Sequence, residues 1–188
     1  MINRLSTLIS DQFVKHNIIP KDAKDVYTYG VEITISSIIG FLITLAIGLL
    51  FDSLINAMIF YVIFISLRSM TGGYHAKTYL KCNFIFTTIA LFVIVFSKAA
   101  YEIQTSFALL TFLFLPAETI IIWLAPVDNI NKPIEEKKRV YWKITAVITS
   151  ILLYVLSILL YINQHTIEAT IIVITVFAVS VLCMIQTK

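Results

Sequence analysis

The sequence predicts an all-α integral membrane protein, a bundle of about six transmembrane helices with an N-terminal amphipathic helix. Hydrophobic residues make up 59% of the 188-residue chain and charged residues only 13%, against about 25% charged residues in a soluble domain. Six apolar runs alternate with polar segments, and a span needs about 20 apolar residues. This length and pattern predict a single membrane domain over residues 1–188.

The first segment, residues 1–29, is expected to be an amphipathic leader rather than a span. Apolar side chains recur there at helical spacing, at Ile2, Leu5, Leu8, Ile9 and Phe13. Two interpretations remain open: a helix lying in the membrane interface, or a polar cap packed on the bundle. A cleaved secretory signal is not expected, because the segment lacks an apolar core before a small-residue cleavage site.

The predicted bundle covers residues 31–185 and is built from six runs, at 31–51, 53–67, 83–100, 105–125, 144–162 and 166–185. The second and third runs have apolar cores of only about fifteen residues, so both are expected to be short spans. A four-span alternative makes these two runs a re-entrant pair. Either arrangement leaves the polar segment between them on the same side of the membrane.

The positions of Lys and Arg predict the orientation of the bundle. With six spans and a cytoplasmic N-terminus, every basic residue except Lys98 falls in a cytoplasmic segment or at a cytoplasmic terminus. The long side chain of Lys98 can reach the opposite interface from a helix end. We therefore expect both termini in the cytoplasm, with the 68–82 and 126–143 segments on the same side.

The polar segment 68–82 is predicted to be a catalytic loop. It contains two of the five glycines, together with Arg68, His75 and Cys82. A thiol attacks only as the thiolate, and Cys82 is expected in the first turn of the third span, where the helix dipole favours an anion. His75 can then act as the general base.

The spacing of His75 and Cys82 sets a structural condition for this pair. On one continuous helix, residues seven apart are offset by about 10.5 Å along the axis, which is too far for a hydrogen bond. The chain must therefore bend between them. Gly72 and Gly73 permit such a bend, and Thr78 is expected to cap the next helix.

The other candidate residues favour simpler interpretations. Cys183 lies in an apolar run and is expected to be a packing residue, while His16 and His165 are expected at the surface. Glu32 and Glu118 stand out as carboxyl groups in apolar runs, but nothing assigns them a catalytic role. No CxxC pair, zinc ligand set or phosphate-binding loop is present, so we expect no metal, no cofactor and no nucleic-acid partner.

Two motifs resemble the accessory gene regulator B (AgrB) family. The first is Arg68-x4-Gly73-Tyr74-His75-Ala76-x5-Cys82, and the second comprises Ala125-Pro126-Val127 and Asn131-Lys132-Pro133-Ile134, followed by basic residues. Length and hydropathy agree, so the resemblance covers essentially the whole chain. It implies a membrane cysteine endopeptidase of Gram-positive bacteria. In that case Cys82 is the nucleophile, His75 the base, and Arg68 and Gly73 are supporting positions.

The resemblance also implies the substrate and the reaction. The substrate is a quorum-sensing pro-peptide with an amphipathic N-terminus and an acidic C-terminal tail. Cleavage through a thioester acyl-enzyme removes the tail, and an internal residue of the peptide then closes a thiolactone or lactone ring. The implied location is the multi-pass bacterial cell membrane, with the active site at the cytoplasmic face.

The basic loop predicted at 126–143 can serve two purposes. It sets the topology and attracts anionic lipids, and Lys137, Lys138 and Arg139 are candidates for binding the acidic tail. The competing hypothesis for the whole chain is a non-enzymatic peptide exporter or scaffold. A homodimer is also compatible with so small a bundle, although no stripe of small residues supports one.

Overall fold

The computed structural model describes residues 2–73, 78–128 and 136–186. The described residues form seven α-helices and one short 3₁₀ helix, Lys21–Ala23. The α-helices are α1 (Ile2–Lys15), α2 (Lys24–Leu50), α3 (Leu54–Thr71), α4 (Tyr79–Glu102), α5 (Phe107–Leu124), α6 (Glu136–Ile162) and α7 (Thr166–Gln186).

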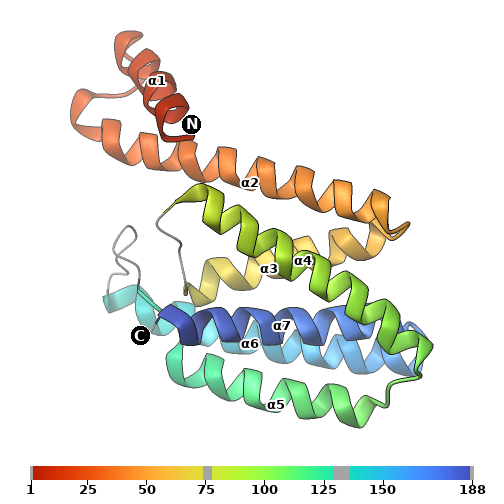
Figure 1. Cartoon of the computed structure of the whole chain (residues 1–188). Coiled ribbons are helices and arrows are strands. Elements are labelled where there is room, and N and C mark those ends of the chain that lie inside the picture. The colour runs from red at the N-terminus through yellow and green to blue at the C-terminus, as the bar shows by residue number, and fades with distance from the viewer. Residues whose placement is uncertain (1, 74–77, 129–135, 187–188) are drawn as a thin grey trace.

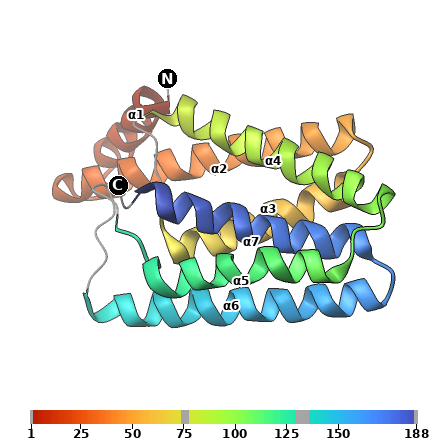
Figure 2. The same cartoon turned by 60° about the horizontal axis from the view of Figure 1, so that its bottom comes forward.

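Helices α2 to α7 form the predicted membrane bundle. Each is long and apolar enough to cross a membrane, and the six run alongside one another in both views (Figures 1 and 2). Because their number is even, the start of α2 and the end of α7 lie at the same end of the bundle. The prediction of an all-α bundle with six spans is confirmed.

Helix α7 occupies the centre of this bundle. It packs against α3, α4, α5 and α6, and its buried residues face all directions around the helix: Ala169, Thr170, Ile171, Ile172, Val173, Ile174, Thr175, Val176, Val179, Ser180, Leu182 and Cys183. A helix that is apolar all round is a buried helix. Outward-facing apolar side chains such as Leu42, Phe92 and Leu152 are exposed, as expected for surfaces that meet lipid.

The structure corrects the expected lengths of two segments. Helix α4 has 24 residues, about 36 Å at 1.5 Å per residue, so the prediction of a short third span is wrong. Its polar first turns, which break the apolar run, are helical nonetheless. Helix α3 extends to Thr71, so residues 68–71 and 79–82 belong to helices and not to a loop.

Two other helices, α2 and α6, also begin earlier in the chain than their apolar runs predict. Helix α2 begins at Lys24, within the segment expected to be the leader. Helix α6 begins at Glu136, so the basic residues of the predicted 126–143 loop lie largely on the first turns of a helix. In both cases polar residues extend a helix beyond its apolar core, and hydropathy alone places the boundary too far inward.

Helix α1 combines features of both interpretations of the leader. It packs on α2, with Ser6 and Ser10 fully buried. Leu5 and Leu8 point away from the protein, with 50% and 58% of their surface exposed. An exposed apolar stripe on a helix that flanks a membrane bundle favours contact with the lipid interface.

The described basic residues gather at one end of the bundle. They lie on α1, the first turns of α2, α4 and α6, and the last turn of α3. Lys98 lies towards the other end, where its ammonium group donates a hydrogen bond to the Phe51 carbonyl in the turn between α2 and α3. The positive-inside rule assigns the end of a bundle that carries more Lys and Arg to the cytoplasmic side.

Candidate active site

The candidate site lies where α3 ends and α4 begins. Gly72 and Gly73 follow α3 with φ angles of 66° and 101°, values that favour glycine. Thr78 is extended and caps α4, since its hydroxyl accepts the Lys81 N–H at 3.4 Å. Helix α3 ends at Thr71 and α4 begins at Tyr79, so no single straight helix runs through residues 70–85, and the pairing of His75 with Cys82 stays a prediction. His75 itself lies outside the described residues.

Cys82 lies in the first turn of α4, as predicted. Its backbone N–H donates to the Thr78 carbonyl at 3.1 Å, so Cys82 is the first residue of α4 to make the full helical hydrogen bond. Its side chain is half-buried. At this position the unpaired N–H groups of the helix start lie nearby and favour a thiolate.

Arg68 supplies the positive charge of the site from the last turn of α3. Its guanidinium group donates a hydrogen bond to the Gly72 carbonyl, and the charge interacts electrostatically with both Cys82 and Cys183. A half-buried cation near a thiol favours the thiolate over the neutral thiol. Arg68 thus interacts electrostatically with two cysteines that are far apart in the sequence.

Gly73 allows three parts of the chain to meet. A Cβ atom at this position would lie 2.6 Å from Arg68 Nη1 and 3.1 Å from the Leu182 carbonyl oxygen, so any larger residue must displace one of them. Gly72 forms an isolated parallel bridge with Val127, and the Val127 N–H donates to the Thr71 carbonyl at 2.9 Å. The segment after α5 is thereby fixed against the end of α3.

Cys183 lies closer to the site than its sequence context indicates. Its side chain is fully buried, as expected for a packing residue. However, its thiol lies against Thr71 and within electrostatic reach of Arg68. The last turns of α7 therefore form the inner wall of the site, a contact between residues more than a hundred positions apart.

The basic residues of α6 lie near the segment that follows α5. Arg139 donates to the Pro126 carbonyl at 3.3 Å and pairs with Asp128 at 2.9 Å. Lys138 is exposed. The side chain of Lys137 lies outside what the structure describes. Arg139 therefore already anchors the chain next to Val127, whereas its predicted role in binding the substrate tail is not tested.

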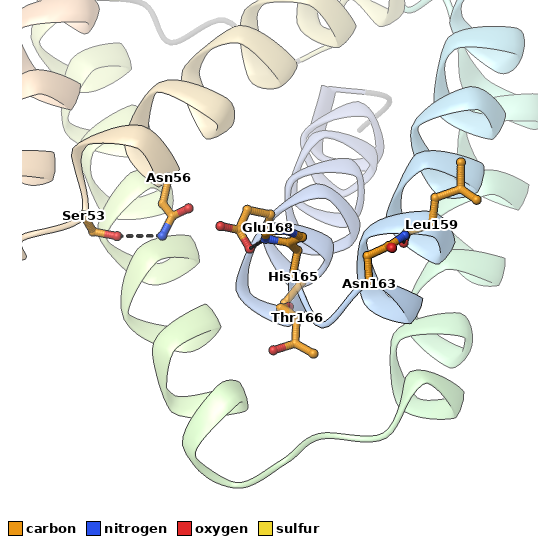
Figure 3. Close-up of polar contacts among 8 residues, drawn as sticks. Ser53, Asn56, Leu159, Asn163, His165, Thr166 and Glu168 are labelled. Carbon is orange, nitrogen blue, oxygen red and sulfur yellow. Dashed lines mark hydrogen bonds and ion pairs between the residues drawn. The ribbon is translucent and has the colours of Figure 1, made fainter.

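The other two histidines are both exposed. His165 precedes α7 at the opposite end of the bundle, where Nδ1 is 3.9 Å from Glu168 (Figure 3). It is exposed, as predicted. His16 is exposed in the turn after α1. The assignment of His75 as the base stays a prediction.

The two carboxyl groups noted in the sequence have different surroundings. Glu32 is buried and accepts hydrogen bonds from Ser6 and Tyr79. Glu118 is buried on α5 near Ser150, and neither of its oxygens has a hydrogen-bond partner among the described residues. Within the same part of the chain, no group of three His, Cys, Asp or Glu side chains could hold a metal ion.

These features define a multi-pass membrane protein with a cysteine and an arginine at one end of its helical bundle. The family model for accessory gene regulator B matches residues 6–186. The chain belongs to this family, which acts in the accessory gene regulation of quorum sensing.

Three relatives illustrate the similarity. An AgrB-like protein of Clostridium perfringens (strain SM101 / Type A) is 31% identical over 171 residues, covering 87% of this chain and 80% of its own length. The accessory gene regulator protein B of Staphylococcus intermedius is 27% identical, covering 68% and 66%. Protein FsrB of Enterococcus faecalis is 28% identical, covering 57% and 44%. No solved structure matches the chain significantly.

Proposed function

We propose that this protein is a membrane cysteine endopeptidase. It cleaves the C-terminal part of a quorum-sensing pro-peptide through a thioester and promotes cyclisation of the remaining peptide. The observation that carries the proposal is the position of Cys82 in the first turn of α4, within electrostatic reach of Arg68. Burial of the sulfur favours the neutral thiol, and a helix start and a guanidinium group both offset this by stabilising the thiolate.

The first step forms an acyl-enzyme. His75 takes the proton of the Cys82 thiol, and the thiolate attacks the carbonyl carbon of the scissile peptide bond. When the carbon–nitrogen bond breaks, the leaving amine of the tail receives the proton from His75. The product is a thioester between Cys82 and the new C-terminal residue of the peptide.

The second step closes the ring and releases the enzyme. A thiol or hydroxyl within the bound peptide attacks the thioester carbonyl carbon, and the bond to the Cys82 sulfur breaks. The proton of the attacking group returns to the Cys82 thiolate. Hydrolysis is the competing reaction, and a half-buried sulfur at the end of a membrane bundle limits access of water to the thioester.

The charge distribution supports one membrane orientation of this site. The described basic residues other than Lys98 gather at the end that carries Cys82, and basic residues are retained on the cytoplasmic side. The proposed active site therefore faces the cytoplasm, where thiols remain reduced. A newly synthesised pro-peptide with an amphipathic N-terminus would meet it at the inner membrane surface.

A trapping experiment tests the thioester directly. The full-length protein in proteoliposomes is mixed with the pro-peptide and quenched with acid, and the acyl-enzyme is then treated with hydroxylamine at neutral pH. We expect an adduct on the peptide containing Cys82, equal in mass to the substrate without its tail, that hydroxylamine removes. An exporter or scaffold forms no adduct and releases no tail, so absence of both products contradicts the proposal.

Replacing basic residues of α6 tests recognition of the acidic tail. Lys137→Gln/Lys138→Gln should raise KM about tenfold while changing kcat less than about threefold, because complementary charge mainly assists binding. The wild-type KM should rise with salt, and this dependence should weaken in the double variant. Steady-state cleavage at two salt concentrations provides the measurement.

Arg139→Gln is the comparison for this pair, because Arg139 also holds Asp128 and Pro126. Its replacement should affect kcat as well as KM. If the double lysine variant, inserted normally in the membrane, has the wild-type KM and salt dependence, these lysines do not bind the tail.

A further inference from the structure

The carboxyl group of Glu32 joins three helices near the site. Glu32 lies on α2 with only 8% of its surface exposed. One of its oxygens accepts a hydrogen bond from the Ser6 hydroxyl of α1 at 3.2 Å, and the other accepts one from the Tyr79 hydroxyl of α4 at 2.5 Å. Both oxygens of a buried polar group are thereby satisfied, which is the usual condition for its burial.

Tyr79 is the first residue of α4, and Cys82 follows three residues later. Residues three apart on a helix lie on neighbouring positions of one face, so an anchor on Tyr79 also limits rotation of the turn that carries Cys82. The same turn has little other packing on its outer side, since Leu80 and Phe84 are 80% and 71% exposed.

We propose that Glu32 and Tyr79 are positioning residues for Cys82. Their hydrogen bond fixes the orientation of the first turn of α4, and Ser6 extends this contact to α1. The inference rests on the proposed function, because it assigns these residues a role in directing the nucleophile. It also predicts that the position of the Cys82 thiol depends on the packing of α1 against α2. The exposed side chains Leu5 and Leu8 of α1 point away from this contact.

The test uses Tyr79→Phe, which removes one hydroxyl and retains the ring. A small displacement of a reacting group can cost about a hundredfold in rate. We expect Tyr79→Phe to lower kcat for pro-peptide cleavage about tenfold, with KM changed less than about twofold. Ser6→Ala should lower kcat in the same direction but by less, since Tyr79 keeps its own bond to Glu32.

Tyr61→Phe is the matched control. Tyr61 also makes a hydrogen bond between helices, donating to the Ser37 carbonyl at 2.9 Å, but it lies on α3 and has no part in the first turn of α4. Its loss should leave kcat and KM within about twofold of the wild type.

A second measurement needs no pro-peptide. The full-length protein in detergent is treated with a maleimide, and labelling of the peptides containing Cys82 and Cys183 is followed by mass spectrometry. Tyr79→Phe should speed labelling of Cys82 about threefold or more, because the loosened turn exposes the thiol. Cys183, which is fully buried, should remain unlabelled and so report that the bundle is intact.

Two results overturn the inference. In one, Tyr79→Phe matches Tyr61→Phe in both kinetics and labelling. In the other, Cys82 and Cys183 become reactive together, which indicates general loosening rather than local positioning. Failure of the proposed function has a different signature: either the wild type releases no tail, or cleavage persists without Cys82. In both cases the labelling comparison between the two tyrosine variants is unaffected.

Discussion

Replacing Cys82 with serine should abolish processing of the pro-peptide. Loss of the nucleophile in a cysteine- or serine-type hydrolase commonly costs more than about 10³-fold in kcat, and a serine hydroxyl is far less acidic than a thiol, so a base suited to Cys82 does not activate it. Mass spectrometry of the peptide products in proteoliposomes measures the effect. Membrane insertion should be unchanged, because serine differs from cysteine by a single atom.

Cys183→Ala is the informative comparison for this variant. Cys183 lies against Thr71 and near Arg68, so its replacement can reduce the rate, but cleavage should remain measurable. Processing by Cys82→Ser at more than a few per cent of the wild-type rate contradicts a nucleophilic role. Loss of processing only in the Cys183 variant would move the nucleophile to α7.

The second large effect is expected for Gly73→Ala. The added methyl group would lie 2.6 Å from Arg68 Nη1 and 3.1 Å from the Leu182 carbonyl, and the φ angle of 101° is strained for alanine. Arg68 must therefore move relative to Cys82. We expect kcat to fall about a hundredfold and the free energy of unfolding to fall by about 1–3 kcal/mol.

Gly30→Ala is the control for this substitution. Gly30 lies on α2, and apart from the local backbone of that helix no atom of the described residues lies within 4 Å of a Cβ built there. Alanine favours a helix over glycine by about 1 kcal/mol, so this variant should keep its activity and gain slightly in thermal stability. Equal activity of the two alanine variants would show that the close approach at Gly73 has no catalytic importance.

The sequence is sufficient to predict much of the fold, because lipid imposes a simple length requirement on each span. The apolar runs identify six helices, and Thr78 is correctly identified as the cap of α4. Hydropathy alone begins this span at residue 83, because Lys81 and Asn83 interrupt the apolar run, whereas the capping residue places the start of α4 correctly. Hydropathy also cannot reveal that α7 is central, since side chains facing lipid and side chains facing protein are equally apolar.

The site is predicted less completely than the fold. Cys82, Arg68 and Gly73 lie close in sequence and form a recognisable motif, whereas Cys183 reaches Arg68 only through the packing of α7 against α3. Glu32 stands out as a carboxyl group in an apolar run, but its partners Ser6 and Tyr79 lie 26 and 47 residues away. Such contacts depend on tertiary structure and leave no local signal.

The central position of α7 has a consequence for biosynthesis. In the order of translation, α7 follows the four spans that it packs against, α3 to α6. Those spans must enter the membrane before their common packing partner exists, and Gly73 cannot meet Leu182 until α7 has been inserted. A ribosome-bound chain that has completed only α1–α6 therefore lacks one wall of the candidate site, so we expect the proposed activity only after α7 has been inserted.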